Sequence, residues 1–165
     1  GLKKMAVDFF LELDGINGEA QDKTHKDKID VLAWSWGASQ SGTTHMGGGS
    51  GSGKASFQDL AITKFVDKAT PVLLQHVSTG KHINKGTLFV RKAAGDNPLE
   101  YIKIEMKDII VTSVQSGGAG SEDRITENIT LNFGEYKYIY TVQNADGSKG
   151  AAPEFAWDIA ANEKK

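Results

Sequence analysis

The sequence predicts an antiparallel all-β domain, a barrel or sandwich of two sheets that carries one short helix. Apolar and polar residues alternate with a period of two over many short segments, and glycine, asparagine and aspartate turns separate these segments. Only residues 70–80 combine helical spacing with helix end signals. At 165 residues the chain is long enough to bury one core, and no linker divides it. We therefore expect a single domain over residues 1–165.

Composition excludes several classes of partner and site. The net charge is −2 with both signs interspersed, which argues against a nucleic-acid-binding surface and against a basic membrane-binding patch. There is no cysteine, so disulfides and thiolate metal sites are excluded. Asp8 and Glu12 interrupt the apolar residues near the N-terminus, which argues against a cleavable signal peptide. Met5 is a candidate native start, in which case residues 1–4 are an added remnant; the sequence alone does not decide this.

The first strand is predicted over residues 6–13, where large apolar residues alternate with Asp8 and Glu12. Residues 14–28 are polar and contain several glycines, so they indicate a surface loop. His25 lies in this loop, and we expect His25 or His45 to make a polar contact with a neighbouring chain rather than to bind a metal.

The segment that organises the rest is residues 29–41, IDVLAWSWGASQS, which we predict as one strand. Alternation places large side chains on one face, and we assign this face to the core: Leu32, Trp34 and Trp36. The opposite face carries small side chains: Val31, Ala33, Ser35, Gly37 and Ser39. Such a face either allows another backbone to approach closely or borders an open, wet space.

Residues 42–54 are rich in glycine, and we expect a protruding, mobile loop. Its end, GGSGSGK over residues 48–54, matches the spacing of a phosphate-binding loop. Ala55, however, stands where a serine or threonine hydroxyl should bind magnesium, and no helix pattern follows. We therefore predict no nucleotide or other cofactor.

A strand over residues 56–66 should place Leu60, Ile62 and Val66 on one face. The helix follows, with Thr70 as its cap, Pro71 in the first turn and Gly80 at its end. Its apolar stripe is Leu73, Leu74 and Val77, and His76 should pack half-buried.

Residues 87–92 and 99–106 should pair as a hairpin, and Asp108 then breaks the alternation, which indicates a bulge or bend. Strands are predicted over residues 125–133 and 155–159. Between them, Tyr136, Tyr138 and Tyr140 share one side. The tyrosines indicate cross-strand packing more strongly than a sugar- or base-stacking platform.

The order of these segments resembles the haemolysin-coregulated protein (Hcp) family, the tube subunit of the bacterial type VI secretion system. The resemblance covers Met5 to Ile159 and depends on seven segments in order: MAVDFFLEL, GEAQDKTH, DVLAWSWGASQSG, HMGGG, DKATPVLL, SEDRITENITLNF and FAW. It implies a β-barrel-like fold of two sheets, a homohexameric ring, and stacking of rings into a tube exported from the bacterial cytoplasm without a cleavable signal peptide.

The resemblance also implies partners and roles for residues. The partners would be further copies of the chain, the sheath, tip spike and baseplate proteins, and small effector proteins in the lumen; no nucleic acid, membrane insertion, metal or enzyme activity is expected. The small face of residues 31–39 would face the lumen and the effectors. Ring or stacking contacts would come from the glycine-rich loop: Thr43, Thr44, His45, Met46, Gly47, Gly48 and Gly49. A stand-alone ligand-binding β module and a hydrolase with a triad assembled by the fold remain as alternatives.

Overall fold

The computed structural model describes residues 7–42, 54–92 and 98–165. The residues assigned to ring or stacking contacts, Thr43 to Gly49, lie outside this part of the chain. One helix, α1, spans Ala69–Thr79. The strand segments are β1 (Val7–Leu13), β2 (Ile29–Val31), β3 (Ala33–Ser35), β4 (Ala38–Ser39), β5 (Ser56–Phe57), β6 (Leu60–Phe65), β7 (Ile83–Lys92), β8 (Leu99–Ser116), β9 (Thr126–Tyr140), β10 (Glu154–Asp158) and β11 (Glu163–Lys164).

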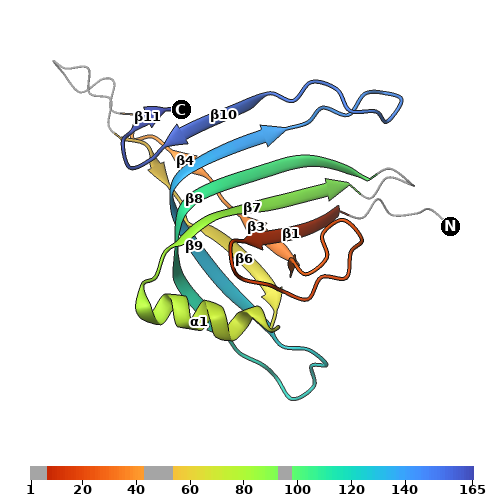
Figure 1. The fold of residues 1–165 in the computed structure, drawn as a ribbon, viewed down its shortest axis with the longest axis vertical. Coiled ribbons are helices and arrows are strands. Elements are labelled where there is room, and N and C mark those ends of the chain that lie inside the picture. Colours follow the sequence, from red (N-terminus) through yellow and green to blue (C-terminus); the bar gives the residue numbers. More distant parts are fainter. Residues whose placement is uncertain (1–6, 43–53, 93–97) are drawn as a thin grey trace.

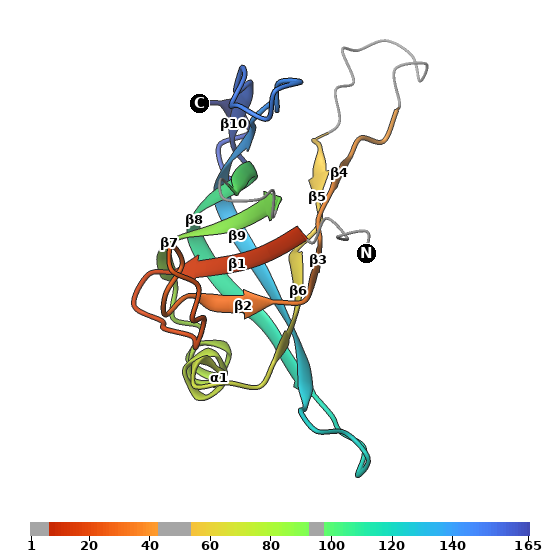
Figure 2. The ribbon, with the colours of Figure 1, turned by 90° about the vertical axis from the view of Figure 1, so that its right-hand side faces the viewer.

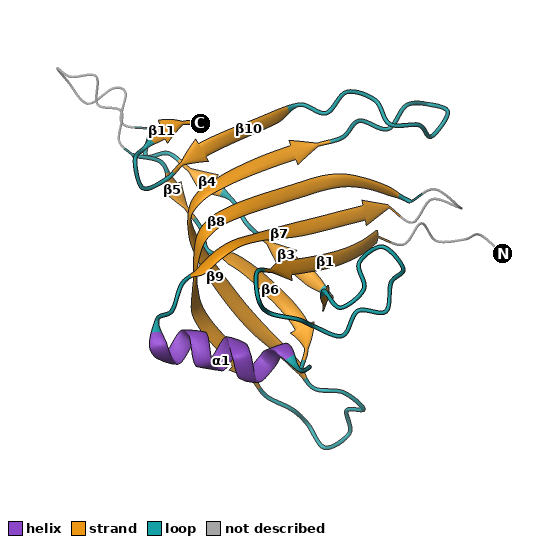
Figure 3. Ribbon diagram, viewed as in Figure 1, coloured by secondary structure: helices purple, strands orange, loops and turns teal. Residues whose placement is uncertain are grey.

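One large antiparallel sheet contains nine of these strands, and its main path runs β11-β10-β9-β8-β7-β1-β2 (Figure 1). The second edge of β9 also pairs with β6, and β6 pairs with β3. The sheet curves strongly, so that β1 and β6 lie on different sides of the interior (Figure 2). The chain from β2 to β3 connects the two sides, where the Leu32 N–H donates to the Thr63 carbonyl at 2.8 Å. The predicted class, mostly β with one short helix, is confirmed (Figure 3).

The core fills the concave side of this sheet. Leu11, Ile62, Leu88, Ile104 and Leu131 come from five different strands and are fully buried. Apart from Phe10 on β1, which is buried on the other side of the sheet, their strand neighbours are exposed or partly exposed, so the period-two pattern of the sequence correctly identified most of the buried side chains.

The strands β8 and β9 are the longest in the sheet, and both change direction at one point. Met106 and Ile109 are buried on β8, and Phe133 and Tyr136 are buried on β9, so the alternation shifts by one residue in each strand. Asp108 has a φ of 54°, in the left-handed region. Because of this shift both strands keep their apolar residues on the core side through the bend predicted at Asp108.

The helix begins at Ala69, two residues before Pro71, the predicted first helical residue, and Thr70 is not its cap. The N-cap position is Lys68, which makes no side-chain cap bond, and the preceding Asp67 satisfies one donor of the first turn: its Oδ1 accepts the Ala69 N–H at 2.9 Å. The helix ends at Gly80, with φ 71°, as predicted. Leu73 is buried, but Leu74 is 45% exposed and does not belong to the packed stripe. The residues that pack instead follow the i, i+3 spacing from Thr70 through Leu73 to His76.

A buried ion pair connects this helix to two strands. Lys64 and Glu127 have fully buried side chains, and Lys64 Nζ lies 2.5 Å from Glu127 Oε1 and 2.8 Å from Asp67 Oδ1. Glu127 Oε1 also accepts the Thr70 hydroxyl at 2.7 Å. Lys64 takes the inward position after Leu60 and Ile62 on β6, whereas Val66, predicted to be inward, is exposed. The pair therefore joins β6, β9 and the first turn of α1.

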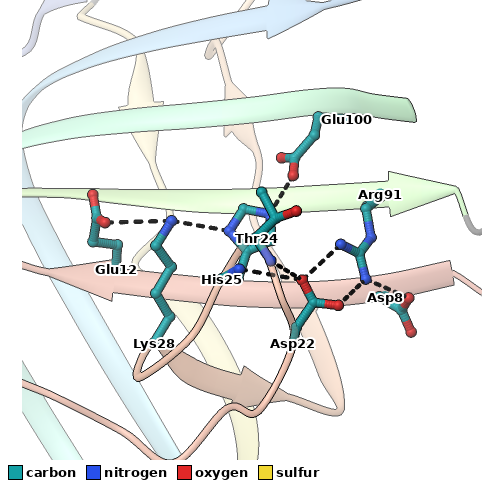
Figure 4. A network of polar contacts seen from close by, with 8 residues as sticks. All are labelled: Asp8, Glu12, Asp22, Thr24, His25, Lys28, Arg91 and Glu100. Carbon is teal, nitrogen blue, oxygen red and sulfur yellow. Dashed lines mark hydrogen bonds and ion pairs between the residues drawn. The ribbon is translucent and has the colours of Figure 1, made fainter. Parts of the chain in front are cut away.

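The long polar loop between β1 and β2 is attached to the sheet by a network of polar contacts (Figure 4) and by aromatic contacts of His25. Arg91 donates to both carboxylate oxygens of Asp22, at 2.6 and 2.9 Å, and to Asp8 at 3.1 Å. The ring of His25 is buried between Phe10 and Phe89, with ring centroids at 4.5 and 4.7 Å.

His25 also has a polar partner at each ring nitrogen. Lys28 Nζ lies 2.9 Å from Nδ1, and Nε2 contacts Glu100. Because an ammonium group can only donate, Nδ1 is the acceptor and Nε2–H donates to Glu100. The expectation that His25 reaches a neighbouring chain is therefore wrong: the loop folds back and buries it.

The buried ion pair should be sensitive to the loss of one partner. Lys64→Met leaves Glu127 as an uncompensated buried charge, and we expect the free energy of unfolding to fall by about 3–5 kcal/mol. The double variant Lys64→Met/Glu127→Leu should regain most of that loss, because no unpaired charge remains. Urea unfolding of the three proteins tests this, and a double variant no more stable than Lys64→Met would contradict it.

The loop network predicts a pH dependence. The Arg91 guanidinium holds the pKa of the Asp22 carboxyl well below its ordinary value of 3.8. A carboxyl whose pKa is lowered by folding adds stability above its unfolded pKa and loses that contribution as the pH falls through its folded pKa. The melting temperature should therefore fall more steeply below about pH 4 in the wild type than in Asp22→Asn. Parallel acid slopes would show that the pair contributes nothing.

Candidate functional surface

The segment predicted as one strand over residues 29–41 is three short strands in different pairings. β2 pairs with β1, Val31 opposite Phe9, whereas β3 pairs with β6, Ala33 opposite Thr63. The chain changes partner at Leu32, which lies in neither strand, and the alternation shifts by one residue. Two assignments are therefore wrong. Leu32, predicted in the core, is 44% exposed, and Val31, predicted on the small face, is 7% exposed and lies in the core.

After Leu32 the inward direction of the tryptophans agrees with the prediction. Trp34 and Trp36 pack against the core, although both remain partly exposed. The Trp36 ring contacts Tyr136, Phe133 and Phe57, with centroids at 4.8, 6.0 and 6.3 Å. These contacts give the segment a single inward direction, so its small side chains must point the other way.

The small side chains do lie on the outer side. Ala33, Ser35 and Ser39 are exposed, and Gly37 is partly exposed. The Gly37 carbonyl accepts the Gln58 N–H at 2.9 Å, which ties this end of the segment to the residues before β6.

Neighbouring strands extend this side into a four-strand surface, which we call the polar face. Residues opposite one another form two rows across β3, β6, β9 and the last part of β8. The first row is Ala33, Thr63, Asn128 and Gln115; the second is Ser35, Ala61, Thr130 and Ser113. Asp59, Thr112 and Asn132 adjoin the second row. Of these residues, sequence reasoning assigned only Ala33 and Ser35; the alternation of Asn128, Thr130 and Asn132 with buried residues was the available signal for the rest.

Side chains of the polar face bind one another. The Thr63 hydroxyl donates to Asn128 Oδ1 at 2.7 Å, and the Thr130 hydroxyl lies 2.6 Å from that of Thr112 and 2.5 Å from that of Ser113. Such pairs restrict the rotamers of the small side chains. The result is a level, hydrogen-bonding surface rather than a pocket.

The remainder of the sheet has a different outer side. Across β7, β8, β9 and β10, one row of opposite residues is Lys85, Lys107, Glu135 and Asp158. Salt bridges there include Lys137 with Glu154 at 3.4 Å. The two ends of the same long strands thus present a charged surface and a nearly uncharged one.

The described part of the chain lacks the residue groups of a metal site and of a serine-histidine-acid triad. It contains no group of three histidine or acidic residues that could hold a metal ion. His25 contacts Glu100 and His82 contacts Asp108, but within residues 7–42, 54–92 and 98–165 no serine hydroxyl bonds to either histidine. None of the helical residues described forms a segment that could span a membrane.

The two sides of the segment 33–39 should respond oppositely to substitution. Trp36→Ala should lower the free energy of unfolding by about 3 kcal/mol, because it removes ring contacts with three aromatic residues. Ser35→Glu should change it by less than about 0.5 kcal/mol, because Ser35 is exposed. Thermal unfolding of both variants decides the matter, and a collapse of Ser35→Glu would place that side chain in packed core.

Comparison with known proteins identifies the family. The family described as "Type VI secretion system effector, Hcp" matches residues 10–140. The chain is 52% identical over 159 residues to Protein hcp1 of Pseudomonas aeruginosa, covering 96% of this chain and 98% of that protein. The crystal structure of Hcp1 from Salmonella typhimurium is similar with a TM-score of 0.81 and 38% identity, covering 98% of this chain and 100% of that one. A type six secretion system protein gives a TM-score of 0.89 at 31% identity, covering 97% and 100%. The chain therefore belongs to the Hcp family of type VI secretion system proteins.

Proposed function

We propose that this chain forms hexameric rings that stack into the exported tube of a type VI secretion system and carry small effector proteins in the lumen. Membership of the Hcp family supports the tube role. The observation that supports cargo carriage is the polar face, a broad, level surface of small hydrogen-bonding side chains on one side of the sheet.

The polar face is the proposed lumen wall. Ala33, Ser35, Gly37 and Ser39 keep the role that the sequence suggested, and Thr63, Asn128 and Thr130 join them. Val31 does not, because it is buried. A wall of short, mutually bonded side chains suits transport, since cargo can form hydrogen bonds with it without entering a deep pocket.

Exposed apolar residues support the ring contacts. A closed ring of identical subunits uses two different surfaces of each subunit. Val7 and Leu32 are exposed near one end of the strand order, and Tyr140 and Phe155 are exposed near the other. Apolar residues exposed at both ends fit a contact in which one end meets the opposite end of the next copy. Residues 43–49, between β4 and β5, are proposed as further ring or stacking contacts.

The remaining partners follow from the tube role. Sheath, tip spike and baseplate proteins would meet the outside or the ends of the tube, and the chain would leave the bacterial cytoplasm through the secretion machine. The role requires no enzyme activity and no cofactor. A stand-alone ligand-binding module has less support, because Tyr136 and Tyr138 pack against the core instead of forming an open platform.

Native mass spectrometry tests the ring directly. At micromolar concentration the wild type should be a hexamer, and monomer or dimer alone would contradict the proposal. Leu32→Asp should weaken the hexamer at least tenfold, because it places a charge in the proposed contact. Leu74→Asp is the matched control: Leu74 is as exposed as Leu32 but lies on α1 and not on the sheet, so this variant should remain hexameric.

A further inference from the structure

Asp59 is the one charged side chain among the described residues of the polar face. It stands immediately before β6, next to Leu60, whose partner on β9 is Leu131. The other outward residues of β3, β6 and the adjoining parts of β8 and β9 are uncharged. Cargo that contacts the two rows therefore meets a single type of formal charge; the nearest positive charge at the far end of β6 is Arg124, whose guanidinium lies 3.8 Å from the centroid of the outward Phe65 ring.

Two side chains hold the Asp59 carboxylate in place. The Thr112 hydroxyl donates to Oδ2 at 2.7 Å, and the Asn132 amide donates to Oδ1 at 3.0 Å. Thr112 reaches this position because β8 has a bulge: the register with β9 shifts between Val111 and Ser113, and Thr112 is the extra residue. A bulge redirects a side chain that regular pairing would place elsewhere.

The two hydrogen bonds leave the carboxylate able to accept more. A carboxylate has about four acceptor positions on its two oxygens. Thr112 and Asn132 occupy one on each oxygen, so one position on each oxygen remains. Two adjacent acceptors match the two parallel N–H groups of an arginine guanidinium better than the single ammonium of lysine.

If the polar face lines the lumen of a hexamer, as proposed above, six Asp59 carboxylates lie at one level, beside two rows of uncharged residues from each subunit. Exposed charges are screened beyond a Debye length of about 8 Å at physiological salt. The carboxylates would therefore act on cargo that touches the wall, and would not attract basic proteins from a distance.

We propose that Asp59 selects cargo by its arginine side chains. The carboxylate, positioned by Thr112 and Asn132, binds guanidinium groups on the surface of the carried protein, and the surrounding hydroxyl and amide groups supply hydrogen bonds without a charge preference. Proteins with arginine on the contacting surface are retained, and those with acidic surfaces are excluded. This inference depends on the proposed ring, because a single carboxylate on a monomer would bind weakly.

The test measures the binding of fluorescein-labelled hexa-arginine, hexa-lysine and hexa-glutamate peptides to the full chain. Fluorescence anisotropy at about 50 mM salt gives the affinities. Hexa-arginine should bind the wild-type ring at least threefold more tightly than hexa-lysine, and hexa-glutamate should not bind. Asp59→Asn removes the charge with little change in shape and should weaken hexa-arginine binding at least tenfold. Glu154→Gln removes one negative charge from the charged part of the sheet and should stay within twofold of the wild type.

Further variants keep the result interpretable. Ala61→Lys leaves Asp59 in place but adds an opposite charge two residues away on the same strand face, and should also abolish hexa-arginine binding. Asp59→Glu keeps the charge and should retain most of the hexa-arginine binding. Native mass spectrometry of each variant checks the ring. A wild type without rings would contradict the proposed function, whereas intact rings with equal binding by wild type and Asp59→Asn, or equal losses in Asp59→Asn and Glu154→Gln, would overturn the role of Asp59.

Discussion

The pairing of β8 with β9 is the interaction on which the rest of the sheet depends. β9 offers one edge to β8 along most of its length, and the other edge to β6 and then to β10. A flat, straight β9 could not pair with β8, β6 and β10 and also enclose a core, because straight strands would extend away from the core. The change of direction at Asp108, where the alternation shifts in both strands, keeps apolar residues inward on both sides of the bend.

This bend also separates the outer surface into two parts. Before it on β8, and after it on β9, the outward residues include lysines and glutamates that lie opposite one another: Glu105 with Lys137 and Lys107 with Glu135. On the other side they are threonine, serine, asparagine and glutamine. The proposed role needs one surface for cargo and others for neighbouring subunits, and the same two strands can supply both because they turn between them.

Buried charges attach the peripheral elements to this sheet. Lys64 and Glu127 join the start of α1 to β6 and β9, and Arg91 and Asp22 join the long loop to β7. Ion pairs of this kind are a weak source of net stability, because burial removes both charges from water. Separating the two partners, however, leaves a buried charge unpaired and lowers the stability strongly, so each pair specifies a single position for the helix or the loop. His25 adds to this for the loop, since both of its ring nitrogens have partners.

The sequence by itself determined the class of fold, most strand positions, the end of the helix at Gly80 and, through the order of its segments, the family. Local signals carry this information: alternation with a period of two and glycine at a left-handed helix end act within a few residues. Only the tertiary structure decided which strand pairs with which. Residues 29–41 show why, because a single alternation continues through Leu32 in the sequence, whereas the chain there leaves β1 for β6. That exchange of partners exposes Leu32 and buries Val31. The inward lysine on β6 and the position of Asp59 beside Thr112 likewise depend on side chains far away in the chain, which no local pattern can place.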